Sequence, residues 1–301
     1  MAPEMHGITV TGLAIYPVKS CAAIDVQEAR VTPRGLELDR DFMLVADDGH
    51  FMSQRRVPEL ALIVPRIGET SITLTAPGIE RVEIPLELEH RDEDLVAATV
   101  HEKPVVGQLV SEELNDWFTT FLPRYRQNTR FRLLRVRDDA PRYVAERYHK
   151  PAASNQLGFA DGSAMLLASE RSLAALNTEM DEPAPMNRFR PNIVIDGERL
   201  APYDEDFWEE LQIGSLEAFV VKASDRCVIP DVDQRTAVTG KAVRRALMSR
   251  KGVNAHDESN TGVFFAQNLN HVYAPGASVK VGDPVRVLSR SAQPNVVLRK
   301  R

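Results

Sequence analysis

The chain has 301 residues, of which 43% are hydrophobic and 27% are charged, and its formal net charge is −6. This composition supports a sizeable buried core and excludes an intrinsically disordered protein. Phosphate binding needs concentrated positive charge, and this acidic chain has no basic stripe interleaved with aromatic residues. Nucleic acid is therefore excluded as the main partner.

The first residues and the cysteine count predict the cellular compartment. Residues 1–20 lack the basic and apolar regions of a secretory signal, and no window of about 18 apolar residues predicts a membrane-spanning helix. The chain has two cysteines, Cys21 and Cys227, and in a chain without an export signal reduced thiols are the default. We expect a cytoplasmic protein without a membrane partner.

The first third of the chain predicts mainly strands, with one helix after them. Residues 8–18, 41–54 and 71–77 are rich in β-branched and aromatic residues between Gly, Pro and Asp, and the Asp-Gly at 48–49 is typical of a hairpin turn. Residues 111–122 change to helical spacing, with Ser111 as the expected N-cap and an apolar stripe that indicates core packing.

The rest of the chain continues this pattern after a charged segment at 135–156, which we interpret as a surface crossing between domains. Strands are expected over 164–169, 192–196 and 215–224, helices over 169–177 and 241–251, and closing strands within 262–289. Many strands, few helices and no regular β–α alternation favour a mainly β or α+β protein that contains barrels.

Cys227 is the first candidate functional residue. It follows a predicted strand and the cation Arg226, and a nearby cation stabilises the thiolate that attacks or binds metal. A free cysteine is more often a small buried apolar residue, and the neighbouring Asp225 and Asp231 raise a thiol pKa. The residues alone leave both interpretations open.

Two other motifs combine a strand boundary with polar or basic residues. "YPVKSC" at 16–21 presents Lys19 and Ser20, which suit an anionic group, and "NRFRPNIVI" at 187–195 places Arg190 and Asn192 just before an apolar strand. Each motif alone is explained as well by a structural role. Lys19 is then a solvated lysine at a strand end, and the arginines form surface ion pairs. The usual dinucleotide, P-loop, serine-hydrolase and zinc-protease motifs are absent from the sequence.

Taken together and in order, the motifs carry a family resemblance. The sequence resembles the MOSC-domain family preceded by its β-barrel N-terminal domain, a group that includes the mitochondrial amidoxime-reducing component and the bacterial YcbX-like proteins. The resemblance rests on "IYPVKSC", "DRDFMLV", "MSQRRVPELALI", "FADGSAMLLAS", "NRFRPNIVI", "SDRC" and "VKVGDPVRVL". It implies an N-terminal β-barrel domain over 1–125, a MOSC β-barrel domain over 126–291 and a tail over 292–301.

The resemblance also implies a molybdenum cofactor, Mo-molybdopterin, with a protein cysteine as a metal ligand. Cys227 occupies the position of that ligand, and Asp161 is expected near the metal, where it handles protons. These two are the expected catalytic residues. The expected cofactor-binding residues are Lys19, Ser20, Arg40, Ser163, Arg190, Asn192 and Arg226.

Three positions depart from the mitochondrial members. Gly162 stands where those members have threonine, Asp225 where they have serine, and Pro230–Asp231 where they have a pair of threonines. An added carboxylate at Asp225 lowers the reduction potential of the metal or selects cationic substrates. The departures concern the substrate range more than cofactor binding.

The implied activity is reduction of N-hydroxylated compounds (hydroxylamines, amidoximes and N-hydroxylated bases) by N–O bond cleavage at a Cys-ligated molybdenum. The partners are then a small-molecule substrate and a separate electron donor, a ferredoxin-like protein or a flavin reductase, because no four-cysteine set follows "VGDPVRVL". The alternative is a sulfur-carrier or molybdenum-cofactor handling protein with a persulfide on Cys227. A binding module without chemistry is less consistent with an intact Lys19, Ser20, Arg190 and Cys227 set.

Overall fold

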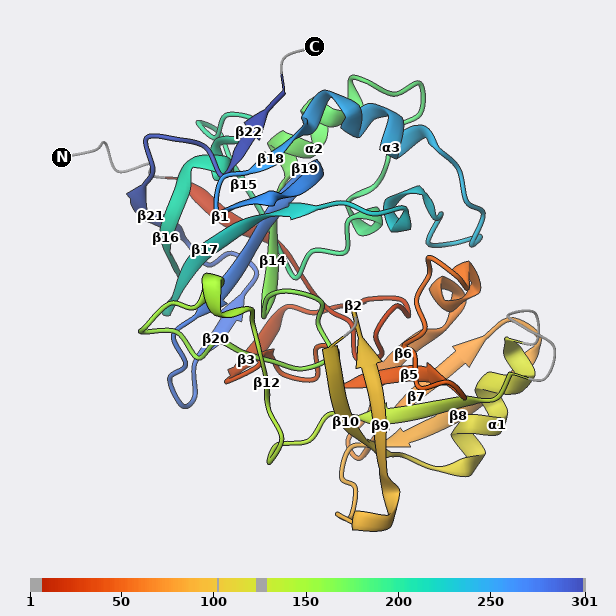
Figure 1. Cartoon of the computed structure of the whole chain (residues 1–301). Coiled ribbons are helices and arrows are strands. Elements are labelled where there is room, and N and C mark those ends of the chain that lie inside the picture. Colours follow the sequence, from red (N-terminus) through yellow and green to blue (C-terminus); the bar gives the residue numbers. More distant parts are fainter. Residues whose placement is uncertain (1–6, 102, 123–128, 300–301) are drawn as a thin grey trace.

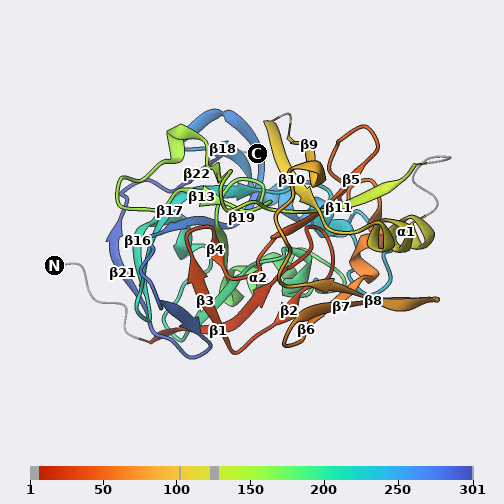
Figure 2. The ribbon, with the colours of Figure 1, turned by 90° about the horizontal axis from the view of Figure 1, so that it is seen from below.

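The computed structural model describes residues 7–101, 103–122 and 129–299. Strands dominate it and helices are few, which confirms the predicted mainly β class. Figures 1 and 2 show two parts side by side. Strands β16 (Trp208–Ile213) and β21 (Val285–Arg290) lie at one end, and helix α1 (Glu112–Phe121) and strand β8 (Ile79–Pro85) lie at the other.

The larger part is built on one ten-stranded sheet that holds both ends of the described chain. Its central order is β2 (Ile24–Asp25), β1 (Ile8–Ile15), β15 (Ile193–Gly197), β14 (Met165–Ser169), β19 (Asp257–His271), β17 (Leu216–Asp225), β16 (Trp208–Ile213) and β21 (Val285–Arg290). Two further strands, β18 (Lys251–Asn254) and β22 (Val296–Leu298), extend it beside β19.

The sheet curves back towards its own edge. An isolated bridge joins Thr9 on β1 to Pro284, directly before β21. The strand pairings of the described residues do not close the sheet into a continuous barrel. Apolar residues from most of these strands, with Trp208, Leu211 and Leu167 among them, form a buried core.

The smaller part contains two sheets and a helix. The four-stranded sheet has the order β5 (Phe42–Ala46), β11 (Phe131–Arg135), β10 (Lys103–Leu109), β9 (Leu95–Val100), and the three-stranded sheet has the order β6 (Val64–Ile67), β7 (Ser71–Ala76), β8 (Ile79–Pro85). All five residues of β5 are buried, as expected for an apolar strand that is covered on both faces. Phe42, Phe118 and Phe131 belong to a second core.

Short strands and helices complete the fold. The short strands are β3 (Glu28–Thr32), β4 (Gly35–Leu36), β12 (Arg142–Tyr143), β13 (Gln156–Leu157) and β20 (Ser278–Lys280), and the α-helices are α1 (Glu112–Phe121), α2 (Glu170–Asn177) and α3 (Ala242–Ala246). A 3-10 turn over Leu247–Arg250 extends α3. None of the described helices is long and apolar enough to cross a membrane.

Several local predictions are confirmed. The Ser111 hydroxyl accepts a hydrogen bond from the Leu114 amide at 3.2 Å and caps α1, and Ser169 caps α2 in the same way. Gly49 has a φ of 76° in the turn after β5, which is the left-handed conformation that the Asp-Gly pair predicts.

The two parts of the structure are not two consecutive stretches of the sequence. β1 lies early in the sequence but pairs with β15 in the large sheet, whereas β11 lies after residue 125 but pairs with β5 and β10. The charged segment 135–156 includes Tyr148, which is buried against Phe219 and Val221 of β17. The predicted division at residue 125 stays a prediction.

Candidate functional site

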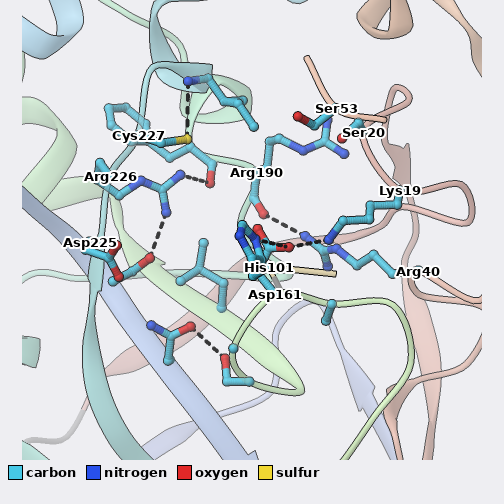
Figure 3. A pocket seen from close by; sticks show the side chains of 18 of the residues that line it. Lys19, Ser20, Arg40, Ser53, His101, Asp161, Arg190, Asp225, Arg226 and Cys227 are labelled. Atoms are coloured by element: carbon cyan, nitrogen blue, oxygen red, sulfur yellow. Dashed lines mark hydrogen bonds and ion pairs between the residues drawn. The ribbon is translucent and has the colours of Figure 1, made fainter. Parts of the chain in front are cut away.

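A cavity of about 380 Å³ lies where the two parts meet. One wall is formed by residues from the first third of the chain, and the other by residues between Ala160 and Asn268. The residues of the first wall are Lys19, Ser20, Arg40, Phe51, Ser53, Arg55 and His101. Figure 3 shows Cys227 and Arg226 on one side of the view and Lys19 and Arg40 on the other. All nine residues predicted from the sequence line this cavity: Lys19, Ser20, Arg40, Asp161, Ser163, Arg190, Asn192, Arg226 and Cys227.

Strand geometry explains part of this convergence. β14 and β15 are parallel neighbours, so the residues that precede them lie at the same sheet edge. Ser163 comes before β14, and Arg190 and Asn192 come before β15. The Asn192 amide donates to the Leu166 carbonyl at 2.8 Å and joins the two strand starts.

Three of the nine residues have a backbone conformation that is uncommon outside glycine. Ser20, Arg40 and Arg190 have φ values of 71°, 54° and 56°. Each such residue costs about 1–3 kcal/mol, and such residues cluster at functional sites, where the surrounding structure holds them in place. Their convergence on one cavity marks it as a functional site independently of any motif.

Lys19 is buried and reaches towards Asp161. Its ammonium group donates to the Phe159 carbonyl at 2.7 Å and forms an ion pair with the Asp161 carboxylate. Burial lowers the pKa of Lys19, and the Asp161 carboxylate opposes that shift. The backbone carbonyl of the next residue, Ser20, accepts a hydrogen bond of 2.7 Å from Gln54 Nε2.

Two guanidinium groups contact one buried tyrosine. The Arg40 and Arg190 Cζ atoms lie 4.4 Å and 4.2 Å from the centre of the Tyr16 ring, within cation–π range. Burial lowers the pKa of Arg190 to about 10, so the group stays charged at neutral pH. Two fixed positive charges therefore line this side of the cavity.

Asn192 and Ser163 already have protein partners. Asn192 Oδ1 accepts from Arg40 Nη1 at 2.9 Å and from the Leu166 amide at 3.2 Å, and Asn192 Nδ2 donates to the Ala14 carbonyl. Ser163 Oγ lies 2.6 Å from Asn268 Oδ1. Asn192 thus orients Arg40, and direct contact of Asn192 or Ser163 with a cofactor stays a prediction.

Cys227 lies two residues beyond the end of β17 and is partly exposed to the cavity. Its sulfur accepts from the Ile229 amide at 3.5 Å. The preceding Arg226 donates from Nη1 to Ser224 Oγ at 2.9 Å and from Nη2 to the Phe189 carbonyl at 2.8 Å, while its buried Nε has no partner among the described residues. Burial lowers the pKa of Arg226, and the nearby Cys227 opposes this.

Asp161 lies among three basic side chains, and its own side chain is 48% exposed. Besides its ion pair with Lys19, Oδ1 lies 3.1 Å from His101 Nε2 and Oδ2 lies 3.8 Å from Arg55 Nη2. The partial loss of hydration in the cavity would raise the pKa of Asp161, but Lys19 and His101 outweigh that effect and hold the pKa well below its usual value. The carboxylate is ionised at neutral pH.

Sequence reasoning missed Arg55 and His101. Arg55 lies in "MSQRRVPELALI", which carried the resemblance but received no role. Burial would lower the pKa of Arg55, but the Cys227 thiol, within hydrogen-bonding reach, contributes to a net rise. His101 follows β9, and no signal in the sequence links it to residues 60 positions away.

A second cavity of about 470 Å³ adjoins the first. The two share Phe51, Ser53, Arg55 and His101, and the second is also lined by His50, Arg56 and Thr99.

A metal in the first cavity would take few ligands from the protein. No group of three or more His, Cys, Asp or Glu side chains arranged to hold a metal ion exists in the described part of the chain. The Cys227 thiol is the soft anionic donor among the residues that line the cavity, and most of the charged side chains there are cations. This donor set suits an anionic cofactor that brings most of its own metal ligands.

Comparison with known proteins agrees with this arrangement. The MOSC N-terminal beta barrel domain matches residues 7–125, and the MOSC domain matches residues 154–286. The mitochondrial amidoxime reducing component 2 of Bos taurus is 32% identical over 285 residues, which cover 92% of this chain and 82% of that protein. The chain belongs to the MOSC-domain family with an N-terminal MOSC β-barrel domain.

Other MOSC-domain relatives extend the comparison. The mitochondrial amidoxime-reducing component 1 of Homo sapiens is 31% identical over 94% of this chain and 83% of that protein. The molybdenum cofactor sulfurase of Bos taurus is 28% identical over 82% of this chain but only 29% of that protein. The family resemblance inferred from the sequence motifs is confirmed.

Proposed function

We propose that this MOSC-domain protein is a molybdenum-cofactor-dependent reductase of N-hydroxylated compounds. The observation that carries the proposal is the convergence of the Cys227 thiol and four basic side chains on one cavity. The names of the relatives support it, since they are amidoxime-reducing components and a molybdenum cofactor sulfurase.

The cavity fits the cofactor in chemistry and size. Mo-molybdopterin carries an anionic phosphate, and Lys19, Arg40, Arg190 and Arg226 supply positive charge around the cavity. The guanidinium of Arg226 is fixed beside Cys227 by Ser224 and Phe189, so its charge is held next to the cavity. A volume of about 380 Å³ lies within the range of small-molecule sites.

Each residue then has a distinct part in the reaction. Cys227 is the protein ligand of the metal, Lys19, Ser20, Arg40, Ser163, Arg190, Asn192 and Arg226 hold the cofactor, and Asp161 handles protons. When bound, the cofactor supplies the redox chemistry that cleaves the N–O bond. The protein supplies fixed charges, orientation and a partly enclosed site.

Two of the positions that depart from the mitochondrial members, Gly162 and Asp225, line the cavity. Asp225 is half exposed, and its carboxylate lies 3.9 Å from Lys222 Nζ. A Cβ at position 162 would lie 3.3 Å from Lys222 Nζ, so Gly162 leaves room for this lysine beside the cavity. We propose that Lys222 and Asp225 tune the substrate range.

The electrons come from a separate donor, which we propose to be a ferredoxin-like protein or a flavin reductase. A cytoplasmic location stays a prediction, and the amidoxime-reducing relatives carry mitochondrial names. No membrane or nucleic-acid partner is part of the proposal.

The decisive experiment measures molybdenum and pterin in the purified protein from a host that makes the cofactor, with Cys227→Ala beside the wild type. The proposal predicts near-equimolar metal in the wild type, loss of metal in the variant, and reduction of a hydroxylamine or amidoxime by the wild type alone. Cys21→Ala is the matched control, because Cys21 is buried outside the cavity lining.

The sulfur-carrier alternative is favoured by one observation, the partly exposed Cys227 thiol between Arg226 and Arg55. Both cations stabilise a thiolate or a persulfide anion. That alternative predicts a protein without stoichiometric molybdenum and with a persulfide on Cys227 by mass spectrometry, which would contradict the reductase.

A further inference from the structure

The proposed reduction consumes protons, and Asp161 is poorly suited to supply them alone. Its carboxylate is ionised at neutral pH because Lys19 and His101 hold its pKa well below the usual value. A general acid works best when its pKa lies near the working pH. An imidazole meets this requirement, because histidine gains and loses a proton between about pH 5 and pH 8.

His101 stands in contact with this carboxylate. Its Nε2 atom lies 3.1 Å from Asp161 Oδ1, and its ring centre lies 5.0 Å from that of Phe51. Figure 3 shows His101 and Asp161 together at the centre of the view, between Cys227 and Lys19. Two contacts on two sides therefore orient the ring.

His101 also lies on a path to solvent. It lines both the first cavity, with Cys227, and the adjoining second cavity. Its side chain is 39% exposed. A residue at this junction can take a proton from water on one side and deliver it on the other.

We propose that His101 is the catalytic proton donor of the N–O reduction and that Asp161 takes part in proton handling by positioning the His101 ring. The inference rests on the proposed function. The reaction R–NHOH + 2 e⁻ + 2 H⁺ → R–NH₂ + H₂O breaks the N–O bond, takes two electrons from the electron-donor protein and takes two protons from water through the imidazole. Asp161 accepts the Nε2–H hydrogen bond, so Nδ1 carries the transferable proton.

The charges around the ring are mixed. Asp161 favours the imidazolium, whereas the Lys19 and Arg55 cations, which both lie within 4 Å of the same carboxylate, oppose it. His50 and Arg56 line the second cavity with His101, and the Asp48 carboxylate lies 3.4 Å from His50 Nδ1. Asp161 is the carboxylate that contacts the ring, at 3.1 Å from Nε2, whereas Asp225 lines the first cavity and pairs with Lys222.

The test compares cofactor-loaded wild type with His101→Gln, Asp161→Asn and the matched control His50→Gln. His50 lies in the second cavity but outside the lining of the first. Turnover of benzamidoxime is measured with dithionite-reduced methyl viologen, so that docking of a donor protein does not limit the rate. Molybdenum content is measured for each protein.

His101→Gln is expected to lower kcat by about 100-fold or more with KM and molybdenum content retained, because general acid catalysis contributes this much. Added imidazole restores part of the rate, and the pH dependence of kcat flattens. His50→Gln keeps the wild-type kcat. By ring-nitrogen NMR, Asp161→Asn changes the chemical shift of His101 Nε2, because an amide replaces the carboxylate that accepts the Nε2–H hydrogen bond.

The inference is overturned if His101→Gln turns over at the wild-type rate, if imidazole does not restore the lost rate, or if Asp161→Asn leaves the chemical shift of His101 Nε2 unchanged. Each of these outcomes leaves the proposed function intact when the wild type holds molybdenum and reduces benzamidoxime. If the wild type holds no molybdenum or does not reduce benzamidoxime, the proposed function is contradicted. The inference about His101 is then contradicted as well.

Discussion

The side-chain amides of Gln54 and Gln234 exchange two hydrogen bonds, of 3.0 Å and 2.9 Å, across 180 residues of sequence. Gln54 Nε2 also lies 2.7 Å from the Ser20 carbonyl, and Gln234 Oε1 lies 3.5 Å from Arg190 Nη1. The pair therefore links the loop after Cys227 to the smaller part of the molecule beside the predicted cofactor-binding residues.

This pair predicts a measurable coupling. Gln54→Ala and Gln234→Ala each leave a buried or half-buried amide without its partner, so each is expected to lower the free energy of unfolding by about 1–3 kcal/mol. The double variant should lose less than the sum of the two, with a coupling of about 1 kcal/mol in urea unfolding. Gln293→Ala, at an exposed position, is the control. Strict additivity would contradict a direct interaction.

The two cysteines should differ sharply in reactivity. Cys21 is fully buried, and burial raises the pKa of its thiol to about 12, whereas Cys227 is partly exposed beside Arg226 and Arg55. Iodoacetamide at pH 8 is expected to label Cys227 in the folded apo-protein and to label Cys21 only after unfolding. Peptide mass spectrometry checks this, and equal labelling of both thiols in the folded protein would refute it.

Asp225 is expected to influence substrate charge. Removal of a carboxylate about 4 Å from a bound cation costs about 1 kcal/mol, which corresponds to about five-fold in kcat/KM. Asp225→Ser should therefore lower kcat/KM for a cationic N-hydroxyguanidine about five-fold relative to a neutral amidoxime. Asp181→Ser, an exposed aspartate outside the cavity lining, is the control. If the ratio of kcat/KM for the two substrates is unchanged, Asp225 does not select substrates by their charge.

Glu205 predicts a pH-dependent stability away from the site. Burial raises its pKa from 4.5 to about 7, and its Oε1 accepts a hydrogen bond from Ser172 Oγ at 2.5 Å. The folded state therefore binds a proton that the unfolded state has lost between pH 4.5 and about 7, so the free energy of unfolding falls as pH rises through this window. The shift corresponds to a loss of about 3 kcal/mol.

Glu205→Gln removes this titration. Urea unfolding at pH 5 and at pH 8 should show that the variant loses about 3 kcal/mol less than the wild type between the two values. Glu209→Gln, at an exposed position on β16, should leave the wild-type difference unchanged. Parallel losses in Glu205→Gln and wild type would show that another group is responsible.

Short-range features of this fold were predictable from the sequence. The caps Ser111 and Ser169 and the turn at Gly49 depend on residues within four positions, so local physics determines them. The pairing of β11 with β5 was not predictable in this way. It depends on two apolar segments about 85 residues apart, and the sequence pattern does not specify which strands become neighbours.

Some residues of the candidate site were predictable from the sequence, and others were not. Lys19, Arg190 and Cys227 stand in motifs whose order identified the family, and the structure brings them to one cavity. His101 and Arg55 stand in no recognised pattern of side-chain chemistry, and only the folded chain places them beside Asp161. The partners of Asn192 are equally nonlocal, since its side chain joins Ala14 to Arg40.

The cavity takes its walls from both parts of the molecule, and this has a thermodynamic consequence. A ligand that contacts Lys19 on one wall and Arg226 on the other is released when either part unfolds or the two separate. Its binding free energy is then added to the stability of both parts at once. Cofactor binding would therefore raise the cooperativity of unfolding. The two parts, which have separate cores, would unfold together in a single thermal transition.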